Sequence, residues 1–408
     1  MTTQTEITWI TVSTDFGYRY RAVIQSPSWP CLLGQTDYPV WAFASKKSPS
    51  VFVGSGIHRR FSDSSVPIGR YKDPLFFQMA YESVSEPMAI LPKQLIQIGP
   101  NNVTLDIYSD TPMSPADCTG RYQVLMTDKE DPLIHLSEQS DTPTLSEWTT
   151  AIASAQAAIK TGPLQKVVLS RKSSFRKTYT DKGHPLYQGF ADALLDTDSY
   201  HYFYQDNDKT IMGHSPEALF RAEGESVSVD VVAGTRSSGE PDSLLASPKD
   251  VNEHAIVLDH VCQILGTYGP VDISERTELS LGTLTHLYQG VSAQVTPTHW
   301  AAIIRDLHPT PAIGGAPKKD ANTLIARLET DARGWYGGLF GLSIDNTLDL
   351  AVAIRGICLT EDHCITQVGA GIVAASDPQQ EWEELNRKLA SVLGRIGHEI
   401  TMTEGASI

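Results

Sequence analysis

The stretch VGAGIVAASDPQQEWEELNRK (residues 368–388) decides between two fold classes. An apolar strand with two glycines precedes a predicted helix. Asp377 is its expected N-cap, Pro378 its first residue, and Gln380 completes a capping box with Asp377. The loose G-x-G-x-x-A pattern in the strand is typical of dinucleotide-binding folds. Here the helix begins several residues too late for that motif, and too few residues follow for a second strand with a ribose-binding acid. The stretch therefore argues against a doubly wound α/β sheet.

Outward from this stretch, strands and helices occur in unequal groups and do not alternate strictly, which favours an α+β fold. Apolar runs predict strands at 40–44, 50–54, 166–171, 201–205, 209–213, 217–222, 226–232, 338–343, 348–355 and 364–368. Periodicity and caps predict helices over 148–159, from about Asp250, over 320–333, and from Asp377 to Gly397. The Gly/Pro/Ser-rich segment 236–249 has the composition of a mobile lid.

The composition is that of an ordinary globular protein, with 408 residues, 41 % hydrophobic and 20 % charged. A polar, proline-containing stretch over 127–145 marks a soft boundary. We therefore expect an N-terminal part over 1–145 and a catalytic part over 146–401. The formal net charge of −16 makes nucleic-acid binding unfavourable. A small anion can still bind if local cations or a metal reverse the field.

The five cysteines are scattered and form no C-x-x-C pair, which favours reduced thiols in a cytoplasmic protein. The first residues lack the pattern of a secretory signal. No apolar run is long enough for a membrane-spanning helix, so we expect no membrane segment.

Two predicted helices carry acids at helical spacing. Glu381, Glu384 and Lys388 share one face of the last helix, at the edge of its apolar stripe. Asp250 and Glu253 lie one turn apart near the start of an earlier helix. Either set can be a solvated ion-pair surface. If both helices turn a carboxylate inward, the oxygen-rich site between them suits Mg²⁺.

Two cations stand in apolar strands. Lys166 opens a strand, where a lysine is usually solvated. Arg355 ends a row of small residues on one strand face, which is compatible with an anion pocket or with a structural ion pair. For His286 and His308, which lie in apolar surroundings, the default expectation is a hydrogen-bonded core histidine.

Nine segments, in order, resemble the chorismate-utilising enzymes, and within them the isochorismate synthases. They are LQKVVLSR (164–171), SPEALF (215–220), VVAGTR (231–236), KDVNEH (249–254), THL (285–287), LHPTPAIGGAPK (307–318), ETDARGWYGGLFG (329–341), AVAIR (351–355) and the stretch 368–388. The resemblance covers about residues 160–400 and is weak in the N-terminal third. It implies packed β-sheets flanked by helices, with the active site in a cleft between the sheets and both parts of the chain in one co-folded body.

The resemblance also implies roles. Lys166 is expected to be the general base that activates water for attack at C2 of chorismate, and Glu217 the general acid that protonates the leaving C4 hydroxyl. Mg²⁺ is expected as cofactor. The residues implied as its ligands are Glu253 and Glu384, with Asp250 and Glu381 as outer or water-mediated ligands. The residues implied in substrate binding are Gly234, Thr235, His286, Tyr336, Arg355, Gly369, Ala370, Gly371 and Lys388.

Two positions separate the members of this family. Anthranilate synthases usually carry Gln where Lys166 stands, and aminodeoxychorismate synthases usually carry Lys where Ala233 stands. The expected activity is therefore that of an isochorismate synthase, with water as nucleophile, no glutaminase subunit, and a monomeric state. A salicylate synthase, which also eliminates pyruvate, is the alternative. A non-catalytic ligand-binding relative and a dinucleotide-dependent dehydrogenase are less favoured.

Overall fold

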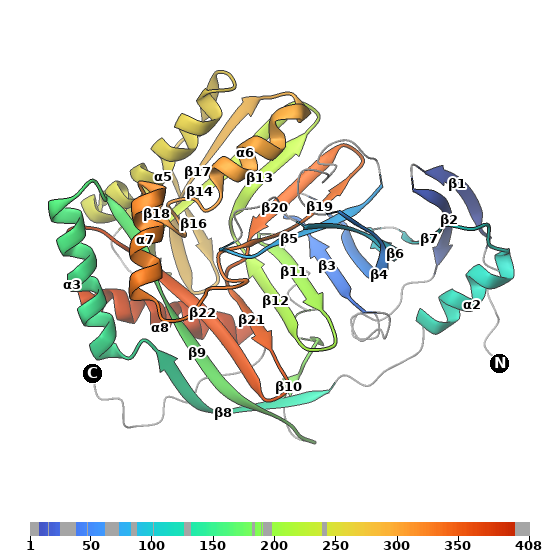
Figure 1. Cartoon of the computed structure of the whole chain (residues 1–408), viewed down its shortest axis with the longest axis horizontal. Coiled ribbons are helices and arrows are strands. Elements are labelled where there is room, and N and C mark those ends of the chain that lie inside the picture. Colours follow the sequence, from blue (N-terminus) through green and yellow to red (C-terminus); the bar gives the residue numbers. More distant parts are fainter. Residues whose placement is uncertain are drawn as a thin grey trace.

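The computed structural model describes residues 8–14, 16–24, 38–46, 48–61, 73–82, 88–100, 102–125, 132–181, 184–188, 190, 198–238 and 243–395. Within these ranges every strand pairing is antiparallel, and the strands form two curved sheets that meet at one shared strand, β6 (Figure 1). Helices cover the outer faces of the sheets.

The first sheet runs from the N-terminal strands to long strands from the later part of the chain. Its order is β1 (Ile10–Thr14), β2 (Gly17–Ile24), β7 (Val103–Ser109), β6 (Met88–Ile98), β4 (Val51–Phe61), β3 (Val40–Ala44), β11 (Tyr200–Gln205), β12 (Thr210–Ser215), β21 (Gly356–Leu359), β22 (His363–Ile372) and β9 (Lys166–Tyr179). Strand β9 also pairs with β8 (Leu133–Thr142) and β18 (Gly315–Ala316), and β10 (His184–Pro185) extends β8.

The second sheet begins where β5 pairs with the first residues of β6. Its order is β5 (Leu75–Met79), β19 (Leu339–Ile344), β20 (Thr347–Val352), β13 (Ala218–Glu223), β14 (Ser226–Ser237) and β17 (Leu284–Gln294), with β15 (Val271–Ile273) and β16 (Thr277–Leu281) along the far edge of β17. In both sheets, strands from the first hundred residues pair with strands from the later part of the chain.

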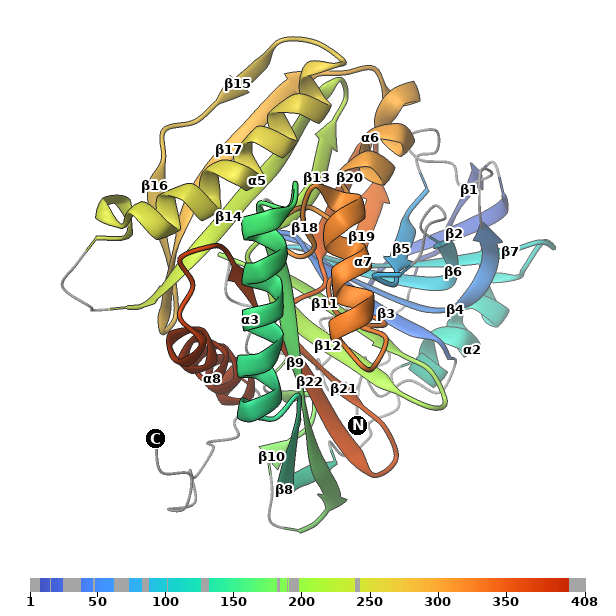
Figure 2. The same cartoon turned by 60° about the vertical axis from the view of Figure 1, so that its left-hand side comes forward.

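The helices are α2 (Pro115–Leu125), α3 (Leu145–Thr161), α5 (Pro248–Gly266), α6 (Trp300–Leu307), α7 (Lys318–Leu328) and α8 (Pro378–Arg395), with 3₁₀ turns η2 (Leu244–Ala246) and η3 (Pro297–His299). Helix α5 packs on β14 and β17, and α8 packs on β22 beside α3 (Figure 2). None of the helices in the described ranges combines the length and the apolar character needed to cross a bilayer.

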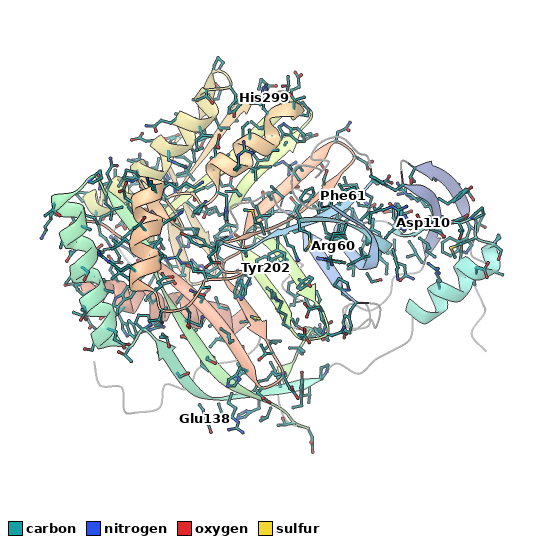
Figure 3. All side chains as sticks on the ribbon, in the orientation of Figure 1. Arg60, Phe61, Asp110, Glu138, Tyr202 and His299 are labelled. Carbon is teal, nitrogen blue, oxygen red and sulfur yellow. The ribbon has the colours of Figure 1, made fainter. Side chains whose placement is uncertain are left out.

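The hydrophobic core joins the two sheets. Tyr202 of β11 stacks on Phe340 of β19, with ring centroids 4.7 Å apart and planes 6° from parallel. Tyr202 lies near the centre of the molecule in Figure 3. The same core cluster contains residues from the first hundred, such as Trp41 and Phe76, and later residues such as Leu350, so apolar packing is continuous across the boundary expected near residue 145.

The α+β expectation is confirmed, and several local expectations are refined. Asp377 caps α8, since its Oδ1 accepts from the N–H groups of Gln379 and Gln380. The helix expected over 320–333 instead covers Lys318–Leu328, because the backbone becomes extended at Glu329. In the segment expected to be a lid, residues 239–242 lie outside the described ranges, whereas η2 and the start of α5 occupy most of 243–249. Gly397 also lies outside them.

Candidate active site

A cavity of about 70 Å³ lies where β14, β17 and β22 face α5 and α8. Charged side chains of both signs line it, namely Glu217, Glu253, Glu384, Arg355 and Lys388. Three hollows elsewhere have larger volumes, about 500, 560 and 180 Å³. Volume alone would favour them, but buried ionisable groups of both signs converge on the smaller cavity. This convergence marks it as the candidate active site.

Lys166 lies directly behind the cavity wall. It opens β9, is 1 % exposed, and its Nζ lies 3.0 Å from Oε1 of Glu253 on α5. Gly371 of β22 contacts both side chains, since a Cβ there would stand 2.1 Å from Glu253 Oε1 and 2.8 Å from Lys166 Cε. Glycine at 371 therefore leaves the room that this ion pair occupies. The default expectation of a solvated strand-end lysine is wrong.

Glu217 lies between β12 and β13 and is 2 % exposed. Its Oε1 has no hydrogen-bond partner within the described residues. Burial raises the pKa of Glu217 to about 8, and repulsion from Asp230 adds to this effect, whereas Lys166 and Lys46 oppose it. Glu217 is therefore a protonated carboxylic acid at neutral pH.

Helices α5 and α8 turn their acids inward. Glu253 and Glu384 line the cavity, and Asp250 and Glu381 are also buried. The reading of α8 as a solvated ion-pair helix is therefore wrong. Burial raises the pKa of Glu381, and the neighbouring Glu384 raises it further.

Lysines neutralise part of this acidic cluster. Lys249 Nζ lies 2.6 Å from Glu381 Oε1, and Lys388 Nζ lies 2.6 Å from Glu384 Oε1. Burial acts to raise the pKa of Glu384, but the positive charges of Lys388, Lys249 and Arg387 together outweigh it and lower that pKa. Across the described ranges, no three acidic, histidine or cysteine side chains are already gathered as ligands of one metal ion. The acids instead face ammonium groups.

The opposite wall of the cavity is cationic. The strand expected over 348–355 ends at Val352, and Arg355 lies in the connection between β20 and β21 with a φ of 55°. Burial lowers the pKa of Arg355 to about 10. Its Nη2 lies 3.0 Å from Nε2 of His286, whose Nδ1 lies 3.1 Å from both Gly234 O and Thr235 Oγ1. Burial, Arg355 and Lys388 hold the pKa of His286 well below its usual value. His286 is therefore neutral, and its Nδ1–H donates while Nε2 accepts from Arg355.

Backbone close to the cavity requires two glycines. Gly234 has a φ of 74°, and a Cβ there would stand 3.0 Å from Asp250 Cβ. A Cβ on Gly369 would stand 2.4 Å from the hydroxyl of Tyr336, and the Gly369 carbonyl accepts a hydrogen bond of 2.8 Å from Lys388 Nζ. Both positions exclude a larger side chain.

The structure brings nearly all of the expected residues to this one place. The cavity is lined by Glu217, Gly234, Thr235, Glu253, His286, Tyr336, Arg355, Gly369, Gly371, Glu384 and Lys388. Ala370 instead packs into the hydrophobic core, because alternate residues of β22 face opposite sides of the sheet. His308 is the expected core histidine, with Nε2 2.9 Å from Gly337 O.

Sequence reasoning missed several residues around the cavity. Gln367 lines it and donates to Ser170 Oγ at 2.7 Å. Lys249 pairs with Glu381, and Lys46 and Asp230 act on the pKa of Glu217. Alternation along 226–232 places Asp230 on the same strand face as Ser226 and Ser228, a pattern that gives no sign of a buried acid.

Comparison with known proteins gives consistent results. The chain is 26 % identical over 391 residues to isochorismate synthase MenF of Haemophilus influenzae, covering 90 % of this chain and 89 % of that protein. It is 30 % identical over 285 residues to anthranilate synthase component 1 of Lactococcus lactis, covering 66 % of this chain and 62 % of that protein.

Solved structures show the same fold. The menaquinone-specific isochorismate synthase MenF of Escherichia coli matches with a TM-score of 0.80 at 22 % identity, covering 96 % of both chains. Anthranilate synthase component I of Streptococcus pneumoniae matches with a TM-score of 0.64 at 18 % identity, covering 96 % of this chain and 93 % of that one.

A family profile covers the whole candidate site and the strands from β6 onward. It is the profile described as chorismate binding enzyme, and it matches residues 88–394. Since this match spans well over half of the chain, the protein belongs to the family of chorismate-binding enzymes.

Proposed function

We propose that the protein is an isochorismate synthase, which adds water at C2 of chorismate and expels the C4 hydroxyl. The observation that carries this proposal is a buried lysine, Lys166, and a buried protonated acid, Glu217, at one cavity of a chorismate-binding enzyme. The two MenF relatives from Haemophilus influenzae and Escherichia coli support it.

Glu217 is suited to the role of general acid. Expulsion of the C4 hydroxyl requires a proton at the departing oxygen, and an acid with a pKa of about 8 holds that proton at neutral pH. The unpartnered Oε1 of Glu217 leaves one side of the carboxyl group available to a ligand. After the proton is donated, Lys166 and Lys46 stabilise the carboxylate that forms.

Lys166 is the proposed general base. Water at C2 must lose a proton as it attacks, and an unprotonated amine can accept it. The Nζ of Lys166 lies 3.0 Å from Oε1 of Glu253, so this contact must open before the amine can meet a water molecule. The position of Lys166 behind Gly371 limits the approach of bulk water to the amine.

The acids of α5 and α8 fit a magnesium ion, which we propose as the cofactor. Glu253 and Glu384 would hold it, with Asp250 and Glu381 as outer or water-mediated ligands. Their oxygen atoms are the ligands that Mg²⁺ prefers, and their mutual repulsion gives a divalent cation a favourable field. When bound, Mg²⁺ would pair with the ring carboxylate of chorismate and neutralise nearby acids.

The cationic wall is proposed to hold the enolpyruvyl carboxylate. Arg355 donates to the neutral His286, which fixes the orientation of its guanidinium group. Tyr336 and the backbone of residues 369–371 lie beside it, although the Ala370 side chain points into the core, and Lys388 adds positive potential. Gly234, Thr235 and His286 would border the ring. Because the cavity is only about 70 Å³, the substrate must displace side chains as it enters.

Product analysis tests the function. The purified protein is incubated with chorismate and Mg²⁺, with and without ammonia, and the products are separated by chromatography. Isochorismate without pyruvate is expected in both cases. Release of pyruvate would favour a salicylate synthase, anthranilate would favour an ammonia-using enzyme, and unchanged chorismate would overturn the proposal. The Glu217→Gln variant controls for contaminating activity.

We further propose that the protein acts in the cytoplasm as a monomer without a glutaminase subunit, and that the parts over 1–145 and 146–401 fold as one unit. The free thiols of Cys118, Cys262, Cys358 and Cys364 support a reducing compartment. The pairings of β3 with β11 and of β5 with β19 support a single unit. Light scattering would test the monomeric state. A single transition in thermal unfolding would support one folding unit.

A further inference from the structure

A buried ion pair holds the backbone on both sides of Glu217. Lys46 follows β3 in the N-terminal part. Its Nζ lies 2.6 Å from Oδ2 of Asp230 on β14. Nζ of Lys46 also donates to the carbonyl of Pro216 at 3.0 Å, and Oδ2 of Asp230 accepts from the N–H of Ala218 at 3.0 Å. The pair therefore binds the residue before Glu217 and the residue after it.

The surroundings of the pair fix it in place. Asp230 is 7 % exposed, and its Oδ1 accepts from the hydroxyl of Tyr288 at 3.0 Å. The ammonium group of Lys46 lies 5.2 Å from the ring centre of Tyr200 and 5.7 Å from that of Tyr288. A cation held over two aromatic rings and bonded to a carboxylate loses little by burial. The ion pair is therefore held in one geometry by its neighbours in the protein interior.

We propose that Lys46 and Asp230 are positioning residues, which set the place and the protonation state of the catalytic acid Glu217. This inference rests on the proposed function, since it assigns to the pair a role in the same reaction. It also gives the N-terminal third, where the family resemblance is weak, a direct part in the chemistry.

The two members of the pair act on Glu217 with opposite signs. Asp230 repels a carboxylate at 217 and keeps its proton on, whereas Lys46 attracts the carboxylate and limits that effect. The third charge with a direct influence is Lys166 of β9. The other titratable or charged groups at the cavity are Glu253, His286, Tyr336, Arg355, Glu384 and Lys388.

The opposite signs make the proposal testable with two variants. Asp230→Asn keeps an oxygen that can accept from Ala218 but removes the negative charge, so Glu217 should lose its proton about 1 pH unit lower. Lys46→Gln removes the positive charge, so Glu217 should lose its proton about 1 pH unit higher. The alkaline limb of the kcat profile for chorismate should follow these shifts in opposite directions, while KM changes by less than about threefold.

A matched control is Asp349→Asn. Asp349 is similarly buried, at 9 %, and pairs with Arg221 at 3.1 Å. Its charge acts on Asp230, whereas the charges that act on the Glu217 carboxyl group are Asp230, Lys166 and Lys46. This variant should lower the thermal stability without moving the limb. If Asp230→Asn and Lys46→Gln also leave the limb in place, or move it in the same direction, the pair is merely structural and the proposal is overturned.

A second measurement separates this inference from the proposed function. The infrared band of a protonated carboxyl group that Glu217→Gln removes can be titrated in the absence of substrate. Its midpoint should lie near pH 8 in the unmodified protein and move down in Asp230→Asn and up in Lys46→Gln. Opposite shifts of this band support the inference even if chorismate is not the substrate. Unmoved midpoints in folded variants contradict it even if isochorismate is made.

Discussion

Two buried lysine–glutamate pairs lie beside the same cavity, and they are built differently. Lys166 and Glu253 come from β9 and α5, and their side chains connect these two elements at 3.0 Å. Lys388 and Glu384 are one turn apart on α8, and Lys388 is also bonded to the Gly369 carbonyl. The first pair joins two separate elements. The second lies within one helix, and its lysine is held by both Glu384 and the Gly369 carbonyl.

This difference suggests that the two lysines have different roles, one in proton transfer and one in substrate binding. A side chain that must take up and release a proton needs a contact that can loosen, which the tertiary pair offers. A side chain that must present a fixed positive charge to a dianion benefits from a contact set by one helix and one carbonyl. We therefore expect Lys166 to affect turnover and Lys388 to affect binding.

The largest effect is expected from Lys166→Met, which tests whether Lys166 acts in turnover. If Lys166 is the general base, kcat for isochorismate formation should fall about 10³-fold, whereas the dissociation constant of chorismate measured by calorimetry should change little. A rate within a factor of ten of the unmodified enzyme would remove Lys166 from the mechanism.

The next largest effect is expected from Gly371→Ala. The added Cβ would collide with Glu253 and Lys166, so one or both must leave their places. We expect kcat to fall about 10²-fold, together with weaker Mg²⁺ binding in calorimetry. Wild-type metal affinity and rate in a folded variant would show that the pair does not depend on the glycine.

Lys388→Met tests the local pair. Losing one positive charge near the substrate should raise KM for chorismate about tenfold, with kcat within threefold. Steady-state kinetics at fixed Mg²⁺ checks this, and Lys388→Arg should restore part of the affinity. A fall in kcat at constant KM would instead give Lys388 a role in turnover.

The pH profile sharpens the contrast with Glu217. Glu384, paired with Lys388, stays ionised at neutral pH because its pKa is lowered, whereas Glu217 stays protonated up to about pH 8. Activity that needs the acid form of Glu217 should therefore fall as pH rises through about 8, by about tenfold per pH unit well above it. A flat profile up to pH 9.5 would contradict Glu217 as the acid.

The smallest expected effect comes from Gly394→Ala, a control on the helix that carries the local pair. A Cβ at this position of α8 meets nothing within 4 Å. The change should stabilise the protein by about 0.5–1 kcal/mol through helix propensity, with unaltered kinetics. Thermal denaturation measures the gain in stability. A loss of activity would mean that the reaction requires the backbone flexibility that Gly394 gives to α8.

The sequence predicted the cap of α8 from the local pattern of Asp377 and Pro378, and it predicted the α+β class from the unequal grouping of strands and helices. Most of the candidate site followed from the family resemblance, since spacing alone left Lys166 and Glu384 as surface residues. The Lys46–Asp230 pair could not be predicted, because it depends on β3 and β14 meeting in space and no local pattern links them. Ala370 differs from this case, because alternation along the strand already places its side chain on the face opposite to Gly369 and Gly371.

The pairing of β5 with β19 has a consequence for synthesis on the ribosome. Met79 leaves the tunnel long before Leu339, its partner in the finished sheet, on the order of tens of seconds at usual translation rates. During that interval the apolar strands of the first hundred residues have open edges, and they are exposed to wrong pairing and to chaperones. The catalytic cleft can close around Glu217 only after nearly the whole polypeptide has been made.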